Sequence, residues 1–501
     1  MLNAQWKRFK SGTDIRGCAL DGVEGEPVNL TDEAVERMAA GFLLWLSGRT
    51  GKAGDTLTVS VGRDSRLSGP RIRDAVVRAL TAGGARVLDC GMASTPAMFM
   101  TTVDLGCDGA IQLTASHHPY HRNGLKFFLP SGGLEGADIT ALLEIAQAED
   151  FPPPASGAVR ETAYMAQYAA RLRRLICEGV KAEDYDHPLA DFRIVVDAGN
   201  GAGGFYARDV LEPLGADVSG SQFLEPDGRF PNHIPNPENP EAMASVCAAT
   251  LKAGADLGVI FDTDVDRAGC VGADGREINR NRLIAMLSAI YLEKEPGSTI
   301  VTDSVTSAGL TRFIEAHGGK HLRYRRGYKN VIDKAIELNR EGIACPMGIE
   351  TSGHCAFAEN YFLDDGAYMA SRLIVELAKR GDLTSLIEGL EEPAEEKEIR
   401  LKLTADNFRP DGEAVIACIK AARDSREDWM ANTDYEGVKV TIRLTGGEGF
   451  FLARLSLHDP VLPINFESDV PGGVTTMAKQ LYDVVKGCKN VDLTPLAELA
   501  R

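Results

Sequence analysis

The stretch DLGVIFDTDVDR, residues 256–267, decides the fold, because it joins an apolar run directly to three acidic residues at alternate positions. The run from Leu257 to Phe261 is typical of a buried strand. The carboxylates follow the carboxyl end of that strand, which is where open α/β sheets bind their ligands. The stretch therefore predicts both a strand of an α/β sheet and a functional loop.

The pattern around this stretch occurs three times along the chain, in residues 57–118, 192–267 and 298–354. Each copy is expected to run strand, polar loop, helix, strand, helix, strand and then a second polar loop. Strands that alternate with helices of this length imply parallel pairing and right-handed crossovers. The expected helices are 70–82, 96–105, 206–214, 240–253, 310–317 and 331–339, and the expected middle strands are 85–91, 217–225 and 320–326.

Ser116, Asp262 and Glu350 occupy the same place in the three copies, just past the last strand. After Glu391 the pattern changes to a charged linker, a strand at 397–404, a helix at 413–422, strands at 438–444 and 450–457, and a final helix at 474–485. We therefore predict an α/β fold with three similar mixed α/β domains plus a smaller C-terminal α+β domain around a central cleft. The predicted domains are 1–158, 159–276, 277–392 and 393–501.

Composition excludes several classes of protein. The net charge of -18 makes the chain a poor non-specific ligand for nucleic acid. Its ten cysteines include no C-x-x-C pair, so neither a zinc site nor a redox motif is indicated, and their spacing fits reduced thiols in the cytoplasm. The start, MLNAQWKRFKSG, lacks the apolar run of a signal peptide, and the longest apolar stretch is too short to span a bilayer. We expect neither nucleic acid nor a membrane as a partner.

Asp262, Asp264 and Asp266 predict a metal site. Three carboxylates so close together repel one another unless a cation lies between them, and oxygen ligands favour a hard ion such as Mg²⁺. An EF-hand would need glycine and glutamate where this chain has Arg267 and Ala273. The alternative is a helix N-cap with solvated aspartates. Arg267 is expected to hold an anion next to the ion.

The stretch LTASHHPYHRNGLKFF, residues 113–128, offers a second set of reactive groups. Ser116 is a candidate nucleophile beside His117 and His118, although a capping serine in a polar turn is an alternative. A hairpin turn expected at Asn123–Gly124 would bring Lys126 back towards the serine. A cation beside a hydroxyl suits a phosphoryl group, because positive charge offsets the charge that develops on its oxygens.

Three weaker patterns complete the set. Glu350, Ser352 and His354 alternate in GIETSGH and suit recognition of sugar hydroxyls, with an ordinary polar loop as the alternative. Arg454 and Ser456 in ARLSLHDPVL suit a phosphate, with a surface turn as the alternative. The run GNGAGG at 199–204 matches a dinucleotide fingerprint, but no clear ribose-binding acid follows, so we expect these glycines to permit close packing.

Taken in order, these stretches resemble the α-D-phosphohexomutase family, in its phosphoglucomutase and phosphomannomutase branch. The similarity covers nearly the whole chain and includes SGTDIRG (11–17), GRDSRLSG (62–69), TASHHP (114–119), PDGRFPNHIPNPENP (226–240), DTDVDR (262–267), ETSGH (350–354) and DDG (364–366). The resemblance implies four domains around a cleft, a serine that is phosphorylated at rest, and a Mg²⁺ ion bound to three aspartates.

The resemblance also implies residue roles. Ser116 would carry the phosphoryl group and would bind the metal together with Asp262, Asp264 and Asp266. The transferring phosphate would be surrounded by Arg16, Lys126 and Arg267, and either His117 or Lys126 would assist proton transfer. The substrate would be bound by Glu350, Ser352, His354, Arg454, Ser456 and Lys329.

The chain departs from the family pattern at three places. His118 stands where the family usually has Asn, and Thr263 stands where Gly is common. The phosphate loop reads RLSLHD at 454–459, with Leu457 and Asp459 in place of hydrogen-bond donors, and Asn465 stands where a second Arg often lies. We therefore expect this loop to bind the substrate's phosphate differently from the corresponding loop in other members of the family.

The function implied by the resemblance is reversible transfer of a phosphoryl group between the 1- and 6-positions of glucose phosphate or mannose phosphate. A hexose 1,6-bisphosphate would be the intermediate and the activator. The alternatives are a mutase for glucosamine or N-acetylglucosamine phosphate, a metal-dependent sugar phosphatase, and an inactive sugar-phosphate binder. We expect a cytoplasmic monomer or homodimer.

Overall fold

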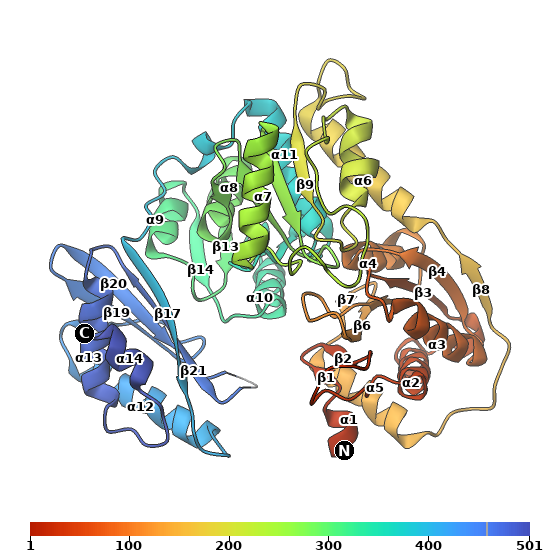
Figure 1. Ribbon diagram of the computed structural model, residues 1–501, viewed down its shortest axis with the longest axis horizontal. Coiled ribbons are helices and arrows are strands. Elements are labelled where there is room, and N and C mark those ends of the chain that lie inside the picture. Colours follow the sequence, from red (N-terminus) through yellow and green to blue (C-terminus); the bar gives the residue numbers. More distant parts are fainter. Residues whose placement is uncertain (457–458) are drawn as a thin grey trace. The chain divides into compact units, whose positions relative to one another are not determined.

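The computed structural model describes residues 1–456 and 459–501. The chain forms two compact units, one made of residues 1–279 and 352–385 and the other of residues 280–351 and 386–501 (Figure 1). No helix among the described residues is both long enough and apolar enough to cross a membrane.

An eight-stranded sheet forms the amino-terminal part of the first unit. Its strands follow the order β1-β2-β6-β5-β3-β4-β8, and β7 pairs with β6. The bounds are β1 (Lys10–Ser11), β2 (Asp14–Cys18), β3 (Thr58–Arg63), β4 (Arg86–Met92), β5 (Gly109–Leu113), β6 (Arg122–Leu129), β7 (Gly132–Gly133) and β8 (Ala158–Glu161). The strands β5, β3, β4 and β8 pair in parallel, as the alternation of strands and helices predicts. β6 returns antiparallel to β5.

The helices of this part are α1 (Ala4–Lys7), α2 (Asp32–Thr50), α3 (Gly69–Ala82), α4 (Thr95–Asp104) and α5 (Gly136–Ala148). The helices expected at 70–82 and 96–105 are therefore present as α3 and α4. Two N-caps explain where helices begin: Thr31 accepts a hydrogen bond from Ala34 N before α2, and Ser94 accepts one from Ala97 N before α4. The core consists of the apolar faces of α1, α2, α3 and α5 and of the central strands.

The hairpin turn predicted at Asn123–Gly124 is wrong. Both residues lie inside β6, where Gly124 pairs with Arg16 and Asn123 with Gly17 of β2. A Cβ atom on Gly124 would lie 2.2 Å from the carbonyl oxygen of Ile15, so the glycine serves the close approach of β2. The chain reverses earlier, between the end of β5 and the start of β6.

The second sheet of this unit has the order β12-β11-β10-β9. Its strands are β9 (Ile194–Asp197), β10 (Leu257–Phe261), β11 (Ala268–Gly272) and β12 (Glu277–Ile278), and β9 and β10 pair in parallel. The apolar run that follows Asp256 is thus the buried strand β10, as predicted. Helix α7 (Pro240–Ala253) has the predicted bounds, and 206–214 forms a π-helical turn followed by a 3₁₀ turn.

The strand predicted at 217–225 is wrong, because only two isolated bridges pair this segment with β9 and its flank. The carboxylate of Asp217 accepts a hydrogen bond from Ser219 N at 3.0 Å, which bends the chain where a ladder would have to continue. The unit also contains α6 (Tyr164–Val180), β16 (Cys355–Phe357) and α11 (Gly366–Arg380), and α6 packs against α11.

The second unit contains a parallel set of strands and an antiparallel sheet. β14 (Lys320–Arg323), β13 (Thr299–Thr302) and β15 (Met347–Ile349) pair in parallel, and their helices are α8 (Arg280–Lys294), α9 (Ala308–Ala316) and α10 (Tyr328–Arg340). The antiparallel order β17-β21-β20-β19-β18 comprises β17 (Glu395–Lys402), β18 (Trp429–Ala431), β19 (Val438–Leu444), β20 (Gly447–Ala453) and β21 (Val461–Ser468).

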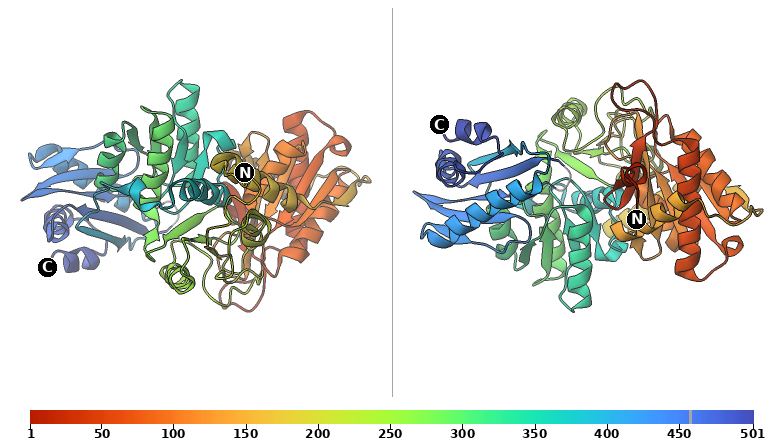
Figure 2. Two further views of the ribbon diagram at one scale, coloured as in Figure 1. Left: turned by 90° about the horizontal axis from the view of Figure 1, so that it is seen from above. Right: turned by 90° about the horizontal axis from the view of Figure 1, so that it is seen from below.

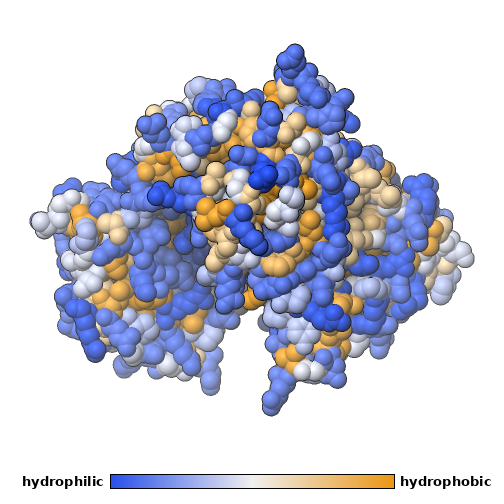
Figure 3. Space-filling view, turned by 45° about the horizontal axis from the view of Figure 1, so that its top comes forward, coloured by the Kyte–Doolittle hydropathy of each residue, from blue (hydrophilic) through white to orange (hydrophobic). Residues whose placement is uncertain are grey.

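Helices α12 (Arg409–Ser425), α13 (Gly473–Val485) and α14 (Thr494–Leu499) pack on the antiparallel sheet (Figures 1 and 2). Together they enclose a separate apolar core. The structure thus confirms mixed α/β sheets followed by a smaller C-terminal α+β domain. Figure 3 shows a mainly hydrophilic surface on which hydrophobic residues are scattered, as the composition leads one to expect.

Candidate functional site

Two loops of the first unit meet at the carboxyl ends of their strands. Ser116 follows β5 and Asp262 follows β10, and the serine Oγ donates a hydrogen bond to Asp262 Oδ2 at 3.3 Å. The same Oγ accepts a hydrogen bond from Arg267 Nη2 at 3.2 Å and lies 3.3 Å from His117 Nδ1. Because 146 positions separate Ser116 from Asp262, only the fold brings the hydroxyl and the acidic loop together.

The three aspartates of the second loop form a compact buried group. One carboxylate oxygen of each lies within 4.8 Å of the others, as a shared metal ion requires. Among the residues that the structure describes, Asp264 Oδ1 and Asp266 Oδ1 are buried and have no hydrogen-bond partner. Buried oxygens without a donor are costly unless an ion binds them, and an oxygen-only set suits Mg²⁺. The donor set therefore fits a divalent cation.

Lys126 of β6 and Thr95 of α4 hold two carboxylates of this acidic group. Lys126 Nζ donates hydrogen bonds to Asp264 Oδ2 at 3.1 Å and to Asp266 Oδ2 at 2.5 Å. Thr95 at the start of α4 donates its hydroxyl to Asp264 Oδ2 at 2.5 Å, and its N–H donates to the backbone carbonyl of Asp264 at 2.8 Å. Lys126 reaches the aspartates although the turn predicted for it was misplaced, because β6 runs antiparallel to β5.

Burial and like charges act differently on the aspartates. Burial raises the pKa of Asp262 well above its usual range, and the carboxylates of Asp266 and Asp264 add to the effect. Burial also acts to raise the pKa of Asp266, but Lys126, His354 and Arg267 outweigh it and hold that pKa below its usual range. The mutual repulsion of these carboxylates is the kind that a bound cation relieves.

Arg267 connects the acidic loop to the serine. Its side chain is buried, and its Nε and Nη2 donate to Asp262 Oδ2 at 3.2 and 3.1 Å. Nη1 donates to Asn236 Oδ1 at 3.1 Å, and Nη2 lies 2.8 Å from His117 Nδ1. The role of Asn236 was missed from the sequence, although it lies within the motif PDGRFPNHIPNPENP at 226–240.

The two histidines after Ser116 are electrically neutral at pH 7. Burial, assisted by Arg267, lowers the pKa of His117 to about 3. Burial, assisted by Arg16, lowers the pKa of His118 to about 4. Since Arg267 donates to Nδ1 of His117, that nitrogen is an acceptor, and its distance from Ser116 Oγ lets it accept a proton there.

Arg16 lies in β2 opposite Gly124 and pairs with Asp14 at 3.1 Å. Its Nε is buried, and no hydrogen-bond partner for it occurs in the described part of the chain. The side chain acts on the two histidines through its charge rather than through a contact with Ser116 Oγ. The N–H at Nε of Arg16 is therefore available to bind an anion near the loop that carries Ser116.

Ser352 and His354 follow Glu350 in sequence but belong to the first unit. His354 pairs with Arg267 through a backbone bridge, and its Nδ1 lies 2.5 Å from Asp364 Oδ2. Burial acts to lower the pKa of His354, but Asp364 outweighs it and raises that pKa to about 9. The imidazole is thus a cation at neutral pH, held by the DDG motif that follows it.

The remaining predicted residues lie in the second unit. Glu350 follows β15 and accepts a hydrogen bond from Gly327 N at 2.7 Å, and Lys329 in α10 pairs with Asp333 at 3.1 Å. Arg454 follows β20, and its Nε is a buried donor with no hydrogen-bond partner among residues 1–456 and 459–501. Ser456 Oγ accepts from Asp459 N at 3.2 Å. Leu457 lies outside the described residues.

The glycines of GNGAGG serve close packing, as the sequence indicated. A Cβ atom on Gly201 would lie 2.6 Å from the carbonyl oxygen of Thr263, and one on Gly204 would lie 2.2 Å from that of Leu224. The absence of a side chain at Gly201 lets the aspartate loop rest against this segment.

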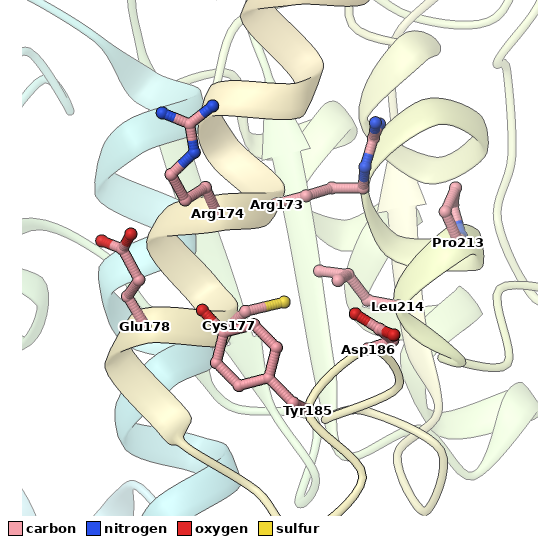
Figure 4. A pocket seen from close by; sticks show the side chains of 8 residues that line it. All are labelled: Arg173, Arg174, Cys177, Glu178, Tyr185, Asp186, Pro213 and Leu214. Carbon is pink, nitrogen blue, oxygen red and sulfur yellow. The ribbon is translucent and has the colours of Figure 1, made fainter.

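A separate cavity of about 530 Å³ lies beside α6 (Figure 4). Its wall includes Arg173, Arg174, Cys177 and Glu178 of α6, together with Tyr185 and Asp186. None of the predicted site residues lines it. Acidic and basic groups are mixed on its wall, so it indicates no particular class of ligand.

Three family models match successive parts of the chain. They are the phosphoglucomutase/phosphomannomutase alpha/beta/alpha domains I, II and III, at residues 13–152, 168–275 and 279–394. Together with the C-terminal domain, they agree with the predicted series of three α/β domains and a smaller α+β domain.

Individual proteins match over most of their length. The chain is 29% identical to a phosphoglucomutase of Neisseria gonorrhoeae, over 85% of this chain and 88% of that protein. It is 32% identical to a phosphomannomutase/phosphoglucomutase of Pseudomonas putida, over 82% of this chain and 83% of that protein. A crystal structure of a phosphoglucomutase/phosphomannomutase family protein from Burkholderia thailandensis superposes with a TM-score of 0.78 at 28% identity, covering 97% and 98% of the two chains.

Proposed function

The chain belongs to the phosphoglucomutase/phosphomannomutase family, and on this basis we propose that it is an isomerase that transfers a phosphoryl group between the 1- and 6-positions of a hexose phosphate. The substrate is proposed to be glucose phosphate or mannose phosphate. The observation that supports this most directly is the hydroxyl of Ser116, which lies within 3.3 Å of both Asp262 and His117 beside a buried acidic group.

In the proposed reaction, the Oγ–P bond of phosphorylated Ser116 breaks as the free sugar hydroxyl forms its own bond to phosphorus, and the proton that this hydroxyl loses passes through His117 to Ser116 Oγ. The sugar is then a hexose 1,6-bisphosphate, and its other phosphate returns to Ser116 after the sugar turns over. Arg267 is placed to neutralise the phosphoryl oxygens, because its Nη2 already contacts Ser116 Oγ. The hexose 1,6-bisphosphate also serves as the activator that phosphorylates Ser116.

Asp262, Asp264 and Asp266 are proposed to hold Mg²⁺ together with an oxygen of phosphorylated Ser116. When bound, the ion supplies positive charge that offsets the dianionic phosphate. Lys126 holds two of these carboxylates in place and adds one further positive charge. His117 Nδ1 is the acceptor nitrogen nearest to Ser116 Oγ, whereas Lys126 is engaged with carboxylates, so we assign proton transfer to His117.

The substrate-binding residues are carried over from the resemblance. Sugar hydroxyls are assigned to Glu350, Ser352 and His354, and the non-reacting phosphate is assigned to Arg454 and Ser456. The buried Nε of Arg454 supports this assignment, because a buried donor of that kind suits an anion. Lys329 is proposed as a further substrate-binding residue. The domains are proposed to be 1–158, 159–276, 277–392 and 393–501, and the protein is proposed to be a cytoplasmic monomer or homodimer.

The chemistry class is tested by the mass of the intact protein. After incubation with glucose 1,6-bisphosphate, the wild type is expected to carry one added phosphate at Ser116, and Ser116→Ala is expected to carry none and to lose mutase activity. Ser60→Ala is the matched control, because Ser60 is a fully buried serine of the adjacent strand β3. A Ser116→Ala variant with full activity would refute the assignment of the carrier.

Substrate and reaction are tested in one assay with glucose 1-phosphate, mannose 1-phosphate and their amino and N-acetylamino analogues. Conversion to the 6-phosphate identifies a mutase and the preferred sugar. Release of inorganic phosphate would instead indicate a phosphatase, and binding without turnover would indicate an inactive binder.

A further inference from the structure

The guanidinium of Arg66 is buried without any exposed area beneath the loop that carries Ser116. An arginine side chain has five N–H groups in one plane, and here each has an acceptor. The acceptors are Asp64 Oδ2 for Nε at 3.2 Å, the carbonyls of Pro119 and Arg122 for Nη1 at 2.8 and 2.9 Å, and the carbonyls of Ser116 and His118 for Nη2, the latter at 2.7 Å. One side chain thus binds four carbonyls of the loop.

The partner of Arg66 also fixes the other side of Ser116. Asp64 Oδ2 accepts a hydrogen bond from Thr114 Oγ1 at 2.7 Å. That hydroxyl oxygen in turn accepts one from Ser116 N at 2.9 Å. Both the N–H and the carbonyl of Ser116 are therefore tied to the Asp64–Arg66 pair.

The backbone of Ser116 needs this support. Its φ is +51°, in the left-handed region that a residue with a side chain seldom adopts. Such a conformation persists only where the surrounding structure imposes it, and it points the side chain in a direction that an ordinary extended residue would not reach. Here that direction takes Oγ towards Asp262.

A segment from the following domain covers the arginine. The ring of Phe230 lies 5.4 Å from the Arg66 guanidinium carbon. A Cβ atom on Gly228 would lie 2.4 Å from the carbonyl oxygen of Ser65 and 2.7 Å from Arg66 Cα. This contact keeps water away, so the hydrogen bonds of Arg66 act in a medium of low polarity.

We propose that Arg66 is the positioning residue for Ser116: its four hydrogen bonds to backbone carbonyls hold the loop 116–122 in the one conformation that aims the phosphoryl-carrying hydroxyl at the acidic group. This inference rests on the proposed function of Ser116. Lysine cannot replace Arg66, because an ammonium group has three donors and cannot present a planar fork to four carbonyls and a carboxylate.

The test compares Arg66→Lys with the wild type in steady-state conversion of glucose 1-phosphate to glucose 6-phosphate. A small misplacement of a reacting group reduces the rate about 10- to 100-fold, so we expect a loss of kcat of that size with little change in KM. The matched control is Arg323→Lys, a partly buried arginine that donates to Ser307 O and Thr311 Oγ1 in the second unit. This control is expected to stay within about twofold of the wild type, since no positioning loss applies there.

Two further measurements keep the inference testable if Arg66→Lys does not fold. Thr114→Val preserves shape and removes only the hydroxyl between Asp64 and Ser116 N, and we expect it to lower kcat with little change in KM. In the wild type, hydrogen exchange of the amides of 116–118 is expected to be as slow as in the neighbouring strand β5. Full kcat in Arg66→Lys or in Thr114→Val, or exchange in this loop as fast as in an unstructured peptide, would overturn the inference.

The two proposals fail in distinguishable ways. If the wild type gains no phosphate at Ser116 and converts no sugar phosphate, the proposed function is wrong. If the wild type is active and Arg66→Lys is equally active, only the positioning role is wrong.

Discussion

Removal of the proposed divalent cation is expected to destabilise the first unit of the protein. The buried oxygens Asp264 Oδ1 and Asp266 Oδ1 have no hydrogen-bond partner in the described part of the chain. Each buried polar atom without a partner costs about 1–3 kcal/mol, so an ion that binds both should recover at least about 2 kcal/mol. Mass action gives a similar figure, because a ligand at a hundred times its Kd stabilises the folded state by about 2.7 kcal/mol.

The assay is thermal unfolding of metal-free protein with increasing Mg²⁺. A stabilisation of this size corresponds to a rise in Tm of about 5 °C for a unit of a few hundred residues. Asp264→Asn is expected to abolish most of this rise, because the amide brings an N–H donor in place of a ligand oxygen.

Asp303→Asn is the matched control for this variant. Asp303 is also fully buried, and its Oδ1 likewise has no partner in the described residues, but it lies in the second unit outside the acidic group. It should therefore keep the full response to Mg²⁺. The reasoning is refuted if Mg²⁺ leaves the Tm of the wild type unchanged, or if Asp264→Asn responds as the wild type does.

Two further predictions concern stability. His233 pairs with buried Asp197 at 3.0 Å, and this pairing outweighs burial and raises the pKa of the imidazole above its usual range. The stability that protonated His233 contributes is therefore full below a pH of about 6.5 and is lost as pH rises through the raised pKa. His233→Gln should cost more in urea unfolding at pH 6 than at pH 9, and an equal cost at both values would contradict this. Gly201→Ala would place a Cβ atom 2.6 Å from the carbonyl oxygen of Thr263, so we expect a loss of about 1–3 kcal/mol and weaker Mg²⁺ binding. Gly48→Ala in α2 meets no atom within 4 Å and should instead stabilise the protein by up to about 1 kcal/mol; similar effects of the two substitutions would contradict the assignment.

The parts of the fold that follow from local pattern were predictable. The apolar run before Asp262 gives a buried strand, and alternating acids after it give a loop of convergent carboxylates, because both depend only on neighbouring residues. The turn predicted at Asn123–Gly124 was wrong because the glycine allows the close approach of β2, a strand more than a hundred positions earlier in the chain. Sequence alone does not reveal that approach.

The supporting residues of the site were missed for the same reason. Arg66 acts on backbone carbonyls some 50 positions away, and carbonyls carry no sequence signal. Asn236 reaches Arg267 across 31 positions and offers only an amide oxygen. Contacts of Arg66 with backbone carbonyls and of Asn236 with Arg267 can be identified only in the folded chain. The acidic and basic residues of the site, in contrast, can be identified from the sequence.

The reach of Lys126 and Thr95 into the aspartate loop has a consequence for modular engineering. A recombinant fragment that begins after α5 would keep all three carboxylates yet leave behind the ammonium and the hydroxyl that restrain two of them. A hybrid of two homologues should therefore take the segment that contains Thr95 and Lys126 and the segment that contains the three aspartates from the same protein. A junction between two different homologues would put at risk the contacts of Lys126 and Thr95 with Asp264 and Asp266.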